Sequence, residues 1–185
     1  VELPAGAKIV HVLSADPARR VFMAASDGYG FLCRVGDMLA AKKAGKQFVT
    51  VESGVTLLAP YLFDDGDNPE DLHVAALSTG GRLLLFPLDQ MKELSGGGRG
   101  VIIMGLDEGE SLASVCIARD SITLSSASRA GRAYEVSIPA KDWETWIGKR
   151  ARKGKAAGGT VVAATSELGR VVTNGMSQYS RNERN

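Results

Sequence analysis

The chain is poor in the residue types that most often carry catalysis or bind metals. Its 185 residues include two histidines and two cysteines. No pair of these residues has the spacing of a zinc site, and no nucleotide-binding glycine motif or G-x-S-x-G motif occurs in a supporting context. The carboxylates between residues 64 and 71 lack the order of an EF-hand loop. The sequence therefore predicts no catalytic residue and no metal site in this chain.

Long apolar runs are also missing. No stretch approaches the ~18 residues that a membrane-spanning helix needs, and no signal peptide is visible. Cys33 and Cys116 stand inside apolar runs, which predicts reduced core residues rather than a disulfide. His11 and His73 fall on the alternating patterns of strands and are predicted as strand residues rather than bases or ligands. We expect a cytoplasmic protein without membrane integration.

Glycine, in contrast, is abundant, and its positions repeat. Apolar segments open at Gly6, Gly54 and Gly109. Each is followed by two apolar runs that meet at a glycine turn and then by an aspartate. The turn glycines are Gly30, Gly81 and Gly131, and the aspartates are Asp37, Asp89 and Asp142. A period of about 50 residues is typical of propeller blades or stacked sheets, in which the three turn glycines should occupy equivalent positions.

Each repeat contains the pattern of about four short strands. Two apolar runs joined by a turn indicate a hairpin, and a stretch with about one turn of helical periodicity follows. The helical turns are predicted near residues 37–41, 89–93 and 142–147, and a further strand near 47–51, 101–104 and 161–164. We predict an all-β chain of three four-stranded blades, at residues 6–52, 54–105 and 109–175, with a polar tail at 176–185. Trp143 and Trp146 should anchor the last helical turn to the strands.

The net charge is only +1, but basic residues are concentrated in the second part of the chain. Residues 1–75 carry seven basic and ten acidic side chains, and residues 76–185 carry fifteen and eleven. The densest basic stretch lies in a Gly- and Ala-rich segment and comprises Lys149, Arg150, Arg152, Lys153 and Lys155. A solvated loop and a loop that contacts phosphates both fit it. The acidic residues between 64 and 71 are predicted to form a polar connection between two strands.

Basic residues recur at the same point of the other repeats. Arg99 stands among four glycines in LSGGGRG, residues 94–100. Glycines can serve close chain passage alone, but a bare backbone also exposes N–H groups and lets an arginine approach a phosphate. The first repeat has three lysines around Gly45, which are Lys42, Lys43 and Lys46. Because repeats place equivalent positions on one continuous rim, the sequence predicts a basic rim.

These residues resemble a known family. The segments MAASDGYGFLCRVGDMLAAKKAGKQFVTV and GGRLLLFPLDQMKELSGGGRGVIIM, together with the basic loop near residue 150, are similar to the C-terminal domain of the A subunit of bacterial DNA topoisomerase IV, ParC, a relative of the gyrase A subunit. The resemblance implies a β-pinwheel, a propeller-like ring whose blades exchange strands. It also implies a non-catalytic domain that binds and bends duplex DNA on its basic outer rim.

The resemblance further implies the setting in which the domain works. The domain would position DNA for ATP-dependent strand passage, decatenation and relaxation during chromosome segregation, in an A2B2 enzyme that contains an A-subunit homodimer and ATPase B subunits and is associated with the bacterial nucleoid. ATP and Mg²⁺ would bind other domains or subunits, so no cofactor is expected here. The catalytic tyrosine of such subunits lies in their N-terminal part. The residues expected to bind DNA are Lys42, Lys43, Lys46, Arg99, Arg150, Arg152, Lys153 and Lys155.

The sequence departs from the family pattern in two ways. Gyrase A subunits carry a seven-residue box, Q-R-R-G-G-K-G, of which this chain keeps only the second half, in Gly97, Gly98, Arg99 and Gly100. This implies bending of DNA without a full chiral wrap. Three repeats are also fewer than usual, and the opening VELPAGAK suggests a piece of a longer protein. The main alternative is a protein-interaction propeller without direct DNA binding, and a more distant one is a ligand-binding β-barrel.

Overall fold

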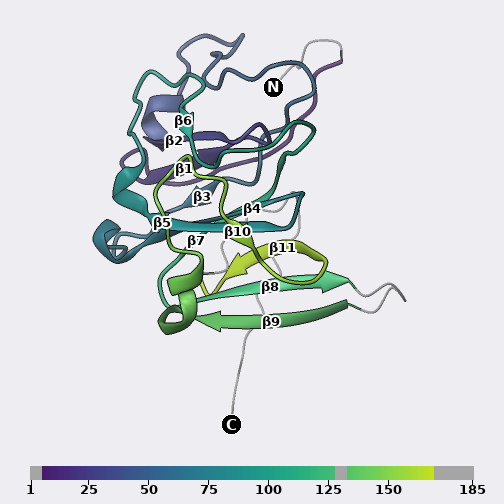
Figure 1. The fold of residues 1–185 in the computed structure, drawn as a ribbon. Helices are drawn as coiled ribbons and strands as arrows, with labels where there is room; N and C mark the ends of the chain where they lie inside the picture. The colour runs from purple at the N-terminus through teal and green to yellow at the C-terminus, as the bar shows by residue number, and fades with distance from the viewer. Residues whose placement is uncertain (1–5, 128–132, 169–185) are drawn as a thin grey trace.

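The chain folds into three antiparallel sheets joined by turns and loops (Figure 1). The computed structural model describes residues 6–127 and 133–168. Its helices are short 3-10 segments, namely η1 (Val35–Met38), η2 (Pro69–Asp71), η3 (Leu88–Gln90) and η4 (Ala140–Thr145). In these two ranges no helix is long and apolar enough to cross a membrane. The prediction of an all-β chain with short helical turns after the hairpins is confirmed.

Each sheet is built around one hairpin. The first sheet has the order β3 (Tyr61–Leu62), β1 (Arg20–Ala24), β2 (Tyr29–Arg34), β6 (Val101–Ile102). The second has the order β7 (Leu112–Ala118), β4 (His73–Ser78), β5 (Arg82–Pro87), β10 (Lys155–Ala156). The third has the order β11 (Val161–Ser166), β8 (Ser121–Ala127), β9 (Ala133–Pro139). Within the described residues the third sheet therefore has three strands, where four were predicted.

Apolar side chains between the sheets form the core. Phe22 of the first sheet and Phe86 of the second belong to one buried cluster, whereas Leu85 of the second and Ile122 of the third belong to another. Neighbouring residues of a strand point to opposite faces, so Phe86 and Leu85 bury both faces of the second sheet. This explains why β4 and β5 are continuous apolar runs rather than alternating ones.

The outer strand of a sheet comes from the following repeat. β6 follows the β4–β5 hairpin along the chain but pairs with β2 of the first sheet, through Gly30 opposite Val101. β10 follows the β8–β9 hairpin but pairs with β5 of the second sheet, through Leu83 opposite Lys155. Antiparallel pairing satisfies backbone groups that would otherwise be exposed at the edges of β2 and β5. The repeats are thus interlocked by strand exchange.

This exchange corrects three of the predicted strands. Residues 47–51 form no strand, and only Val49 makes a bridge, in parallel with Gly98. The strand expected at 101–104 is limited to β6. The strand expected at 161–164 exists as β11, but β11 pairs with β8 and so is the counterpart of β7, not of β6. The true counterpart of β6 is β10, whose two residues are too few and too polar to give a strand signal.

The hairpin registers also correct the equivalence of the turn glycines. Arg20 lies opposite Arg34 in the first hairpin, and His73 lies opposite Pro87 in the second. Aligned on these pairs, Gly81 corresponds to Gly28, and both have positive φ, at 74° and 88°. Gly30 instead lies inside β2, opposite Ala24. The predicted equivalence of Gly30 and Gly81 is therefore wrong by two residues, and Gly131 lies outside the described residues.

Trp143 anchors η4 to the strands, as the sequence predicts. Its side chain is buried, its indole N–H donates to the carbonyl of Ile138 at 3.0 Å, and its ring meets that of His73 edge-on at 5.4 Å. Trp146 donates to the carbonyl of Ala156 in β10. His73 begins β4, as expected, but His11 precedes β1 and lies in no strand; its ring nitrogen is 3.4 Å from the carbonyl of Leu57.

Both cysteines are free; Cys33 is buried and Cys116 is half-buried, and desolvation makes both poor nucleophiles. Burial raises the pKa of Cys33 to about 12, with smaller contributions from Asp37 and Glu93. Burial likewise raises the pKa of Cys116 to about 12, with a smaller contribution from Glu167. Because the thiolate is the reactive species, both should react with a maleimide far more slowly in the folded protein than after denaturation, as measured by mass spectrometry at pH 7.5. Rapid labelling of either one in the folded state would contradict the buried placement.

Candidate nucleic-acid interface

Two loops of equal length project from equivalent sheet edges. In the first sheet, the chain contacts Leu32 of β2 at residues 92–94 and rejoins the edge at β6. In the second sheet, it contacts Leu85 of β5 at residues 146–148 and rejoins the edge at β10. The seven residues between these contacts are the first outer loop, 94–100 (LSGGGRG), and the second outer loop, 148–154 (GKRARKG).

The two outer loops share backbone features as well as length. Gly100 and Gly154 end them with φ of +88° and +73°, and a Cβ on either would overlap the carbonyl of Gly30 or Leu83 on the adjoining strand. Gly97 has φ +71°, and its counterpart Ala151 has φ +66°. Ala151 is the one non-glycine residue with positive φ in the described part of the chain. The loops are therefore structural equivalents, although their sequences differ.

The equivalence places basic residues at matching positions. Arg99 of the first outer loop corresponds to Lys153 of the second. Lys149 and Arg150 correspond to Ser95 and Gly96, so the second outer loop has a pair of cations that the first lacks. Sequence reasoning matched the two basic stretches but not their individual residues, because Ala151 and Arg152 replace the two glycines that mark the first loop. The contacts of residues 146–148 and of β10 with the second sheet reveal the alignment.

Three of the predicted DNA-binding residues in the two outer loops have partners within the protein. Arg99 makes ion pairs with Glu52 at 2.7 Å and Asp27 at 3.2 Å, and its guanidinium lies 4.0 Å from the centre of the Tyr29 ring. Lys153 pairs with Asp107. Arg150 is half-buried and donates to the carbonyl of Ile102 in β6 at 2.6 Å, while its backbone N–H donates to Gln90.

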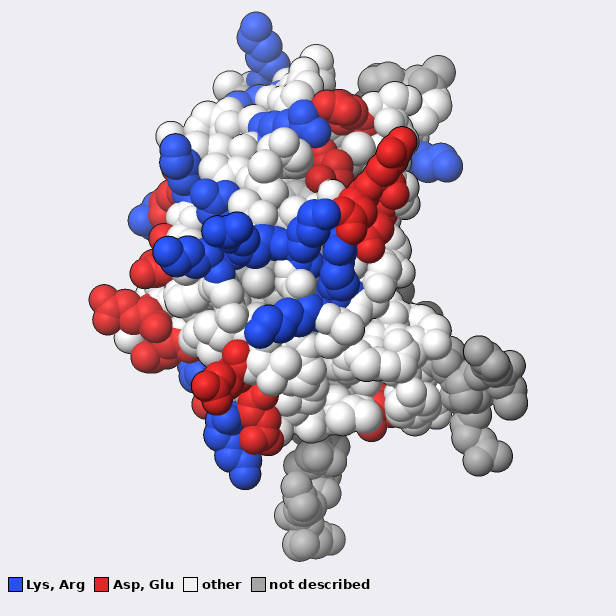
Figure 2. Space-filling model, in the orientation of Figure 1, with Lys and Arg blue, Asp and Glu red and all other residues white. Residues whose placement is uncertain are grey.

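The other cations of the second outer loop and β10 are exposed. Lys149, Arg152 and Lys155 have no ion pair with any residue in the ranges that the structure describes. Figure 2 shows Lys and Arg gathered in a band across the middle of one face, where β10 lies beside β5 in Figure 1, with Asp and Glu near both ends of the band. Spaced, exposed cations on a fixed backbone can contact successive phosphates of a nucleic acid.

The lysines of the first repeat lie on a segment that runs beside the first outer loop. Gly98 donates to the carbonyl of Phe48, and Thr50 donates to the carbonyl of Gly98. Lys46 donates to the carbonyl of Asp37 and lies 5.1 Å from the centre of the Phe48 ring. Lys42 and Lys43 are exposed in the turn before it. The structure thus brings this basic segment next to the first outer loop, and Lys46 is partly engaged by contacts within its own segment.

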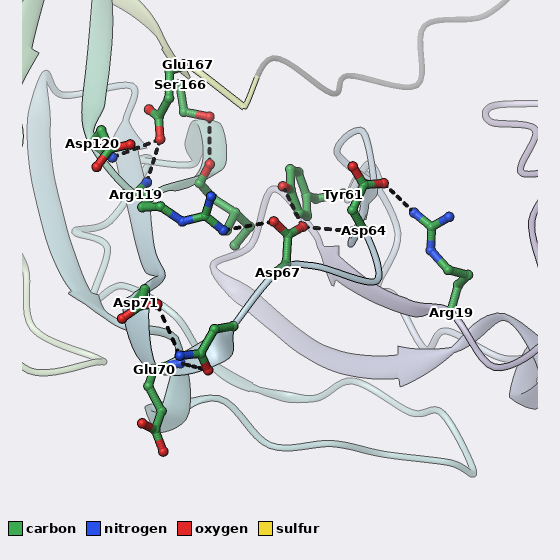
Figure 3. Close-up of polar contacts among 12 residues, drawn as sticks. Arg19, Tyr61, Asp64, Asp67, Glu70, Asp71, Arg119, Asp120, Ser166 and Glu167 are labelled. Atoms are coloured by element: carbon green, nitrogen blue, oxygen red, sulfur yellow. Dashed lines mark hydrogen bonds and ion pairs between the residues drawn. The ribbon is translucent and has the colours of Figure 1, made fainter.

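The acidic segment at residues 64–71 links the sheets (Figure 3). Asp67 is nearly buried and accepts hydrogen bonds from Arg119 at 3.0 Å and from the backbone N–H of Asp64 at 2.8 Å. Asp64 pairs with Arg19 at 2.8 Å. Glu167 accepts from the backbone N–H groups of residues 119–121. The prediction that residues 64–71 form a polar connection between two strands is confirmed. No cluster that could hold a metal ion occurs in residues 6–127 and 133–168.

Comparisons with known proteins give these loops a context. The A subunit of DNA topoisomerase 4 from Neisseria gonorrhoeae is 34% identical over 155 residues, which are 82% of this chain and 20% of that subunit. The chain is a relative of topoisomerase IV A subunits. The subunit from Haemophilus influenzae is 30% identical over 159 residues, 83% of this chain and 20% of that subunit. The chain thus spans about one fifth of the length of these relatives.

The fold comparison agrees. The structure of the E. coli ParC C-terminal domain has a TM-score of 0.74 and 23% identity over 88% of this chain and 66% of that one. The DNA gyrase A C-terminal domain gives a TM-score of 0.58 with 15% identity, covering 82% of this chain and 48% of that chain. The family described as DNA gyrase C-terminal domain, beta-propeller matches residues 73–115, which run from β4 into β7 of the second sheet. The predicted resemblance to the topoisomerase IV and gyrase A domains is confirmed.

A second family description, FAD-dependent protein, C-terminal domain-like, matches residues 156–185. Of these residues the structure describes 156–168, which contain the end of β10 and the whole of β11. Both strands belong to the sheets of the repeated fold.

The outer-loop geometry gives a test by glycine substitution. Gly100→Ala and Gly154→Ala should each destabilise the fold, because alanine at positive φ costs about 1–2 kcal/mol before the overlap with the neighbouring carbonyl is added. Gly96→Ala is the matched control, since a Cβ there meets nothing within 4 Å and φ is not positive. Urea unfolding measures the difference. Equal stability of all three variants would mean that the loops do not require their observed backbone.

Proposed function

We propose that this chain is a non-catalytic domain of a topoisomerase IV A subunit that binds and bends duplex DNA. The observation that carries the proposal is the group of exposed cations Lys149, Arg152 and Lys155, which have no ion pair within the described residues. They lie on the second outer loop and β10, which contacts with β5 hold in place. Contacts of this kind reach phosphates and need no reader of base edges. Binding should therefore be largely independent of sequence and strongly dependent on salt.

The relatives extend this proposal to the intact enzyme. The domain presents bent DNA to a cleavage core in another part of the A subunit, within an A2B2 enzyme of A and ATPase B subunits. ATP and Mg²⁺ act in those other parts, and this domain takes no cofactor. The enzyme would relax supercoils and unlink daughter duplexes during chromosome segregation, in the bacterial cytoplasm at the nucleoid. The identity of 30–34% with topoisomerase IV A subunits supports this setting.

Charge removal from the exposed band tests the DNA interaction. Arg152→Ala combined with Lys155→Ala should weaken binding to unrelated duplexes by similar factors, because neither cation has a carboxylate partner among residues 6–127 and 133–168. The slope of log K against log salt should flatten by roughly 0.9 for each phosphate that the protein no longer neutralises. Fluorescence anisotropy with a labelled duplex over a salt series measures both effects.

The matched control is Lys8→Ala combined with Lys141→Ala, which removes the same charge from exposed residues outside the outer loops. It should weaken binding much less and leave the slope nearly unchanged. If the control weakens binding as strongly, the DNA site lies elsewhere. If the wild-type chain fails to bind DNA even at low salt, the protein-interaction alternative is favoured.

The outer loops also predict the topological outcome. Bending a duplex smoothly costs about 1–6 kcal/mol for each 20–30 base pairs, so a full wrap needs cations all around the rim. Here the second outer loop carries the cationic cluster, whereas the first has Arg99 alone, and that arginine is ion-paired. We expect little change in linking number when nicked circular DNA is religated with the domain bound. A large positive shift would contradict bending without a chiral wrap.

A further inference from the structure

Each outer loop has a cation that pairs with a carboxylate, and the two cations occupy equivalent positions in the loops. Arg99 precedes Gly100 and pairs with Glu52, and Lys153 precedes Gly154 and pairs with Asp107. The two carboxylates are equivalent in sequence as well, because Glu52 stands two residues before Gly54 and Asp107 two residues before Gly109. Both of these glycines have positive φ, at 84° and 79°, and both open the segments that repeat along the chain.

Around each pair, a similar arrangement is built from different residues. In the first sheet, Asp27 supplies a second carboxylate to Arg99, and Tyr29 at the start of β2 lies against the guanidinium. In the second sheet, the counterpart of Tyr29 is Arg82 at the start of β5, which binds Asp107 at 2.7 Å and also pairs with Glu110.

Glu110 supplies the second carboxylate of the second sheet. A Cβ on Gly80, the counterpart of Asp27, would overlap the carboxylate of Glu110. In the first sheet both carboxylates pair with Arg99, whereas in the second Asp107 pairs with Lys153 and Glu110 pairs with Arg82, which also binds Asp107. Retention of the arrangement despite different residues points to a role that the arrangement itself performs.

Stability of the fold does not explain these pairs. The side chains remain accessible, at 38% and 68% for Arg99 and Glu52 and at 62% and 46% for Lys153 and Asp107. Exposed pairs of this kind contribute little to folding. Hydrogen bonds from Lys153 and then from Arg82 lower the pKa of Asp107, so this carboxylate stays ionised at neutral pH. Each pair thus neutralises a cation of an outer loop.

We propose that Glu52 and Asp107 limit the affinity for DNA by holding Arg99 and Lys153 away from phosphates. This inference rests on the proposed function. A phosphate that recruits Arg99 or Lys153 exchanges one ion pair for another, so the gain is smaller than for a cation such as Arg152, which has no ion pair within the described residues. The carboxylates are positioning residues for the DNA interaction, and they leave the domain able to release a duplex after strand passage.

Removal of each carboxylate charge tests this role. Asp107→Asn should tighten binding to a labelled duplex several-fold and steepen the slope of log K against log salt by roughly 0.9, which corresponds to one more neutralised phosphate. Glu52→Gln should tighten binding in the same direction but by less, because Asp27 still pairs with Arg99. The matched control is Glu108→Gln, because Glu108 is exposed, adjacent to Asp107 and without an ion pair in the described ranges. It changes the net charge by the same amount and should tighten binding much less.

A second set of variants, made in a Lys153→Gln protein, separates the effect of the Asp107–Lys153 ion pair from the effect of a change in net charge. In the Lys153→Gln protein, Asp107→Asn should give no more gain than Glu108→Gln, since Lys153 is absent and Arg82 stays paired with Glu110. Equal gains from Glu108→Gln and Asp107→Asn in the wild-type background, or an undiminished gain without Lys153, would overturn the inference.

Folding and binding controls complete the experiment. Circular dichroism checks each variant, and Glu52→Gln carries the test if Asp107→Asn disturbs the fold through Arg82, because Glu52 is the more exposed carboxylate. If the wild-type chain binds DNA and the variants match the control, the inference fails while the proposed function stands. If the wild-type chain does not bind, the proposed function itself fails.

Discussion

The pairing of the first two hairpins with strands from the following repeats is the interaction on which the structure depends. β2 and β5 would otherwise present open edges of backbone donors and acceptors, which attract other strands. β6 and β10 close these edges inside the chain. The same pairing fixes both ends of each outer loop, since the chain must leave the edge after Leu32 or Leu85 and return to it a few residues later. These fixed ends set the length of both outer loops and the positions of their cations and glycines.

Charge on this scaffold is distributed by local pairing rather than by net composition. A chain of net charge +1 can still present exposed cations, because carboxylates such as Asp67 and Glu167 are engaged in hydrogen bonds with other parts of the protein. Others, such as Glu52 and Asp107, pair with cations of the outer loops and neutralise them. Counting charges along the sequence therefore identifies the basic loop but not which of its members are paired.

The sequence predicted what depends on local pattern and missed what depends on partners far along the chain. Hairpins and helical turns were found because apolar runs and turn residues are local signals. β10 was missed, since its pairing with β5 is decided by the second sheet and not by the sequence Lys155–Ala156. Arg99 was identified as a basic residue, but its pairing with Asp27, 72 positions away, has no local signal. For the other partner of Arg99, Glu52, the sequence did hold a clue, because an acidic residue recurs two positions before Gly54 and Gly109.

Ala151 gives the second outer loop a stiffness that the first does not have. Three consecutive glycines leave residues 96–98 many backbone conformations, and ordering them on a ligand costs conformational entropy. Alanine at φ +66° allows far fewer. The loop with four basic residues is thus the one already restricted before any partner arrives, so less freedom remains to be lost on binding. Charge and backbone restriction therefore coincide in the second outer loop, whereas the first relies on the hydrogen bonds of Gly98 with Phe48 and Thr50 to hold its shape.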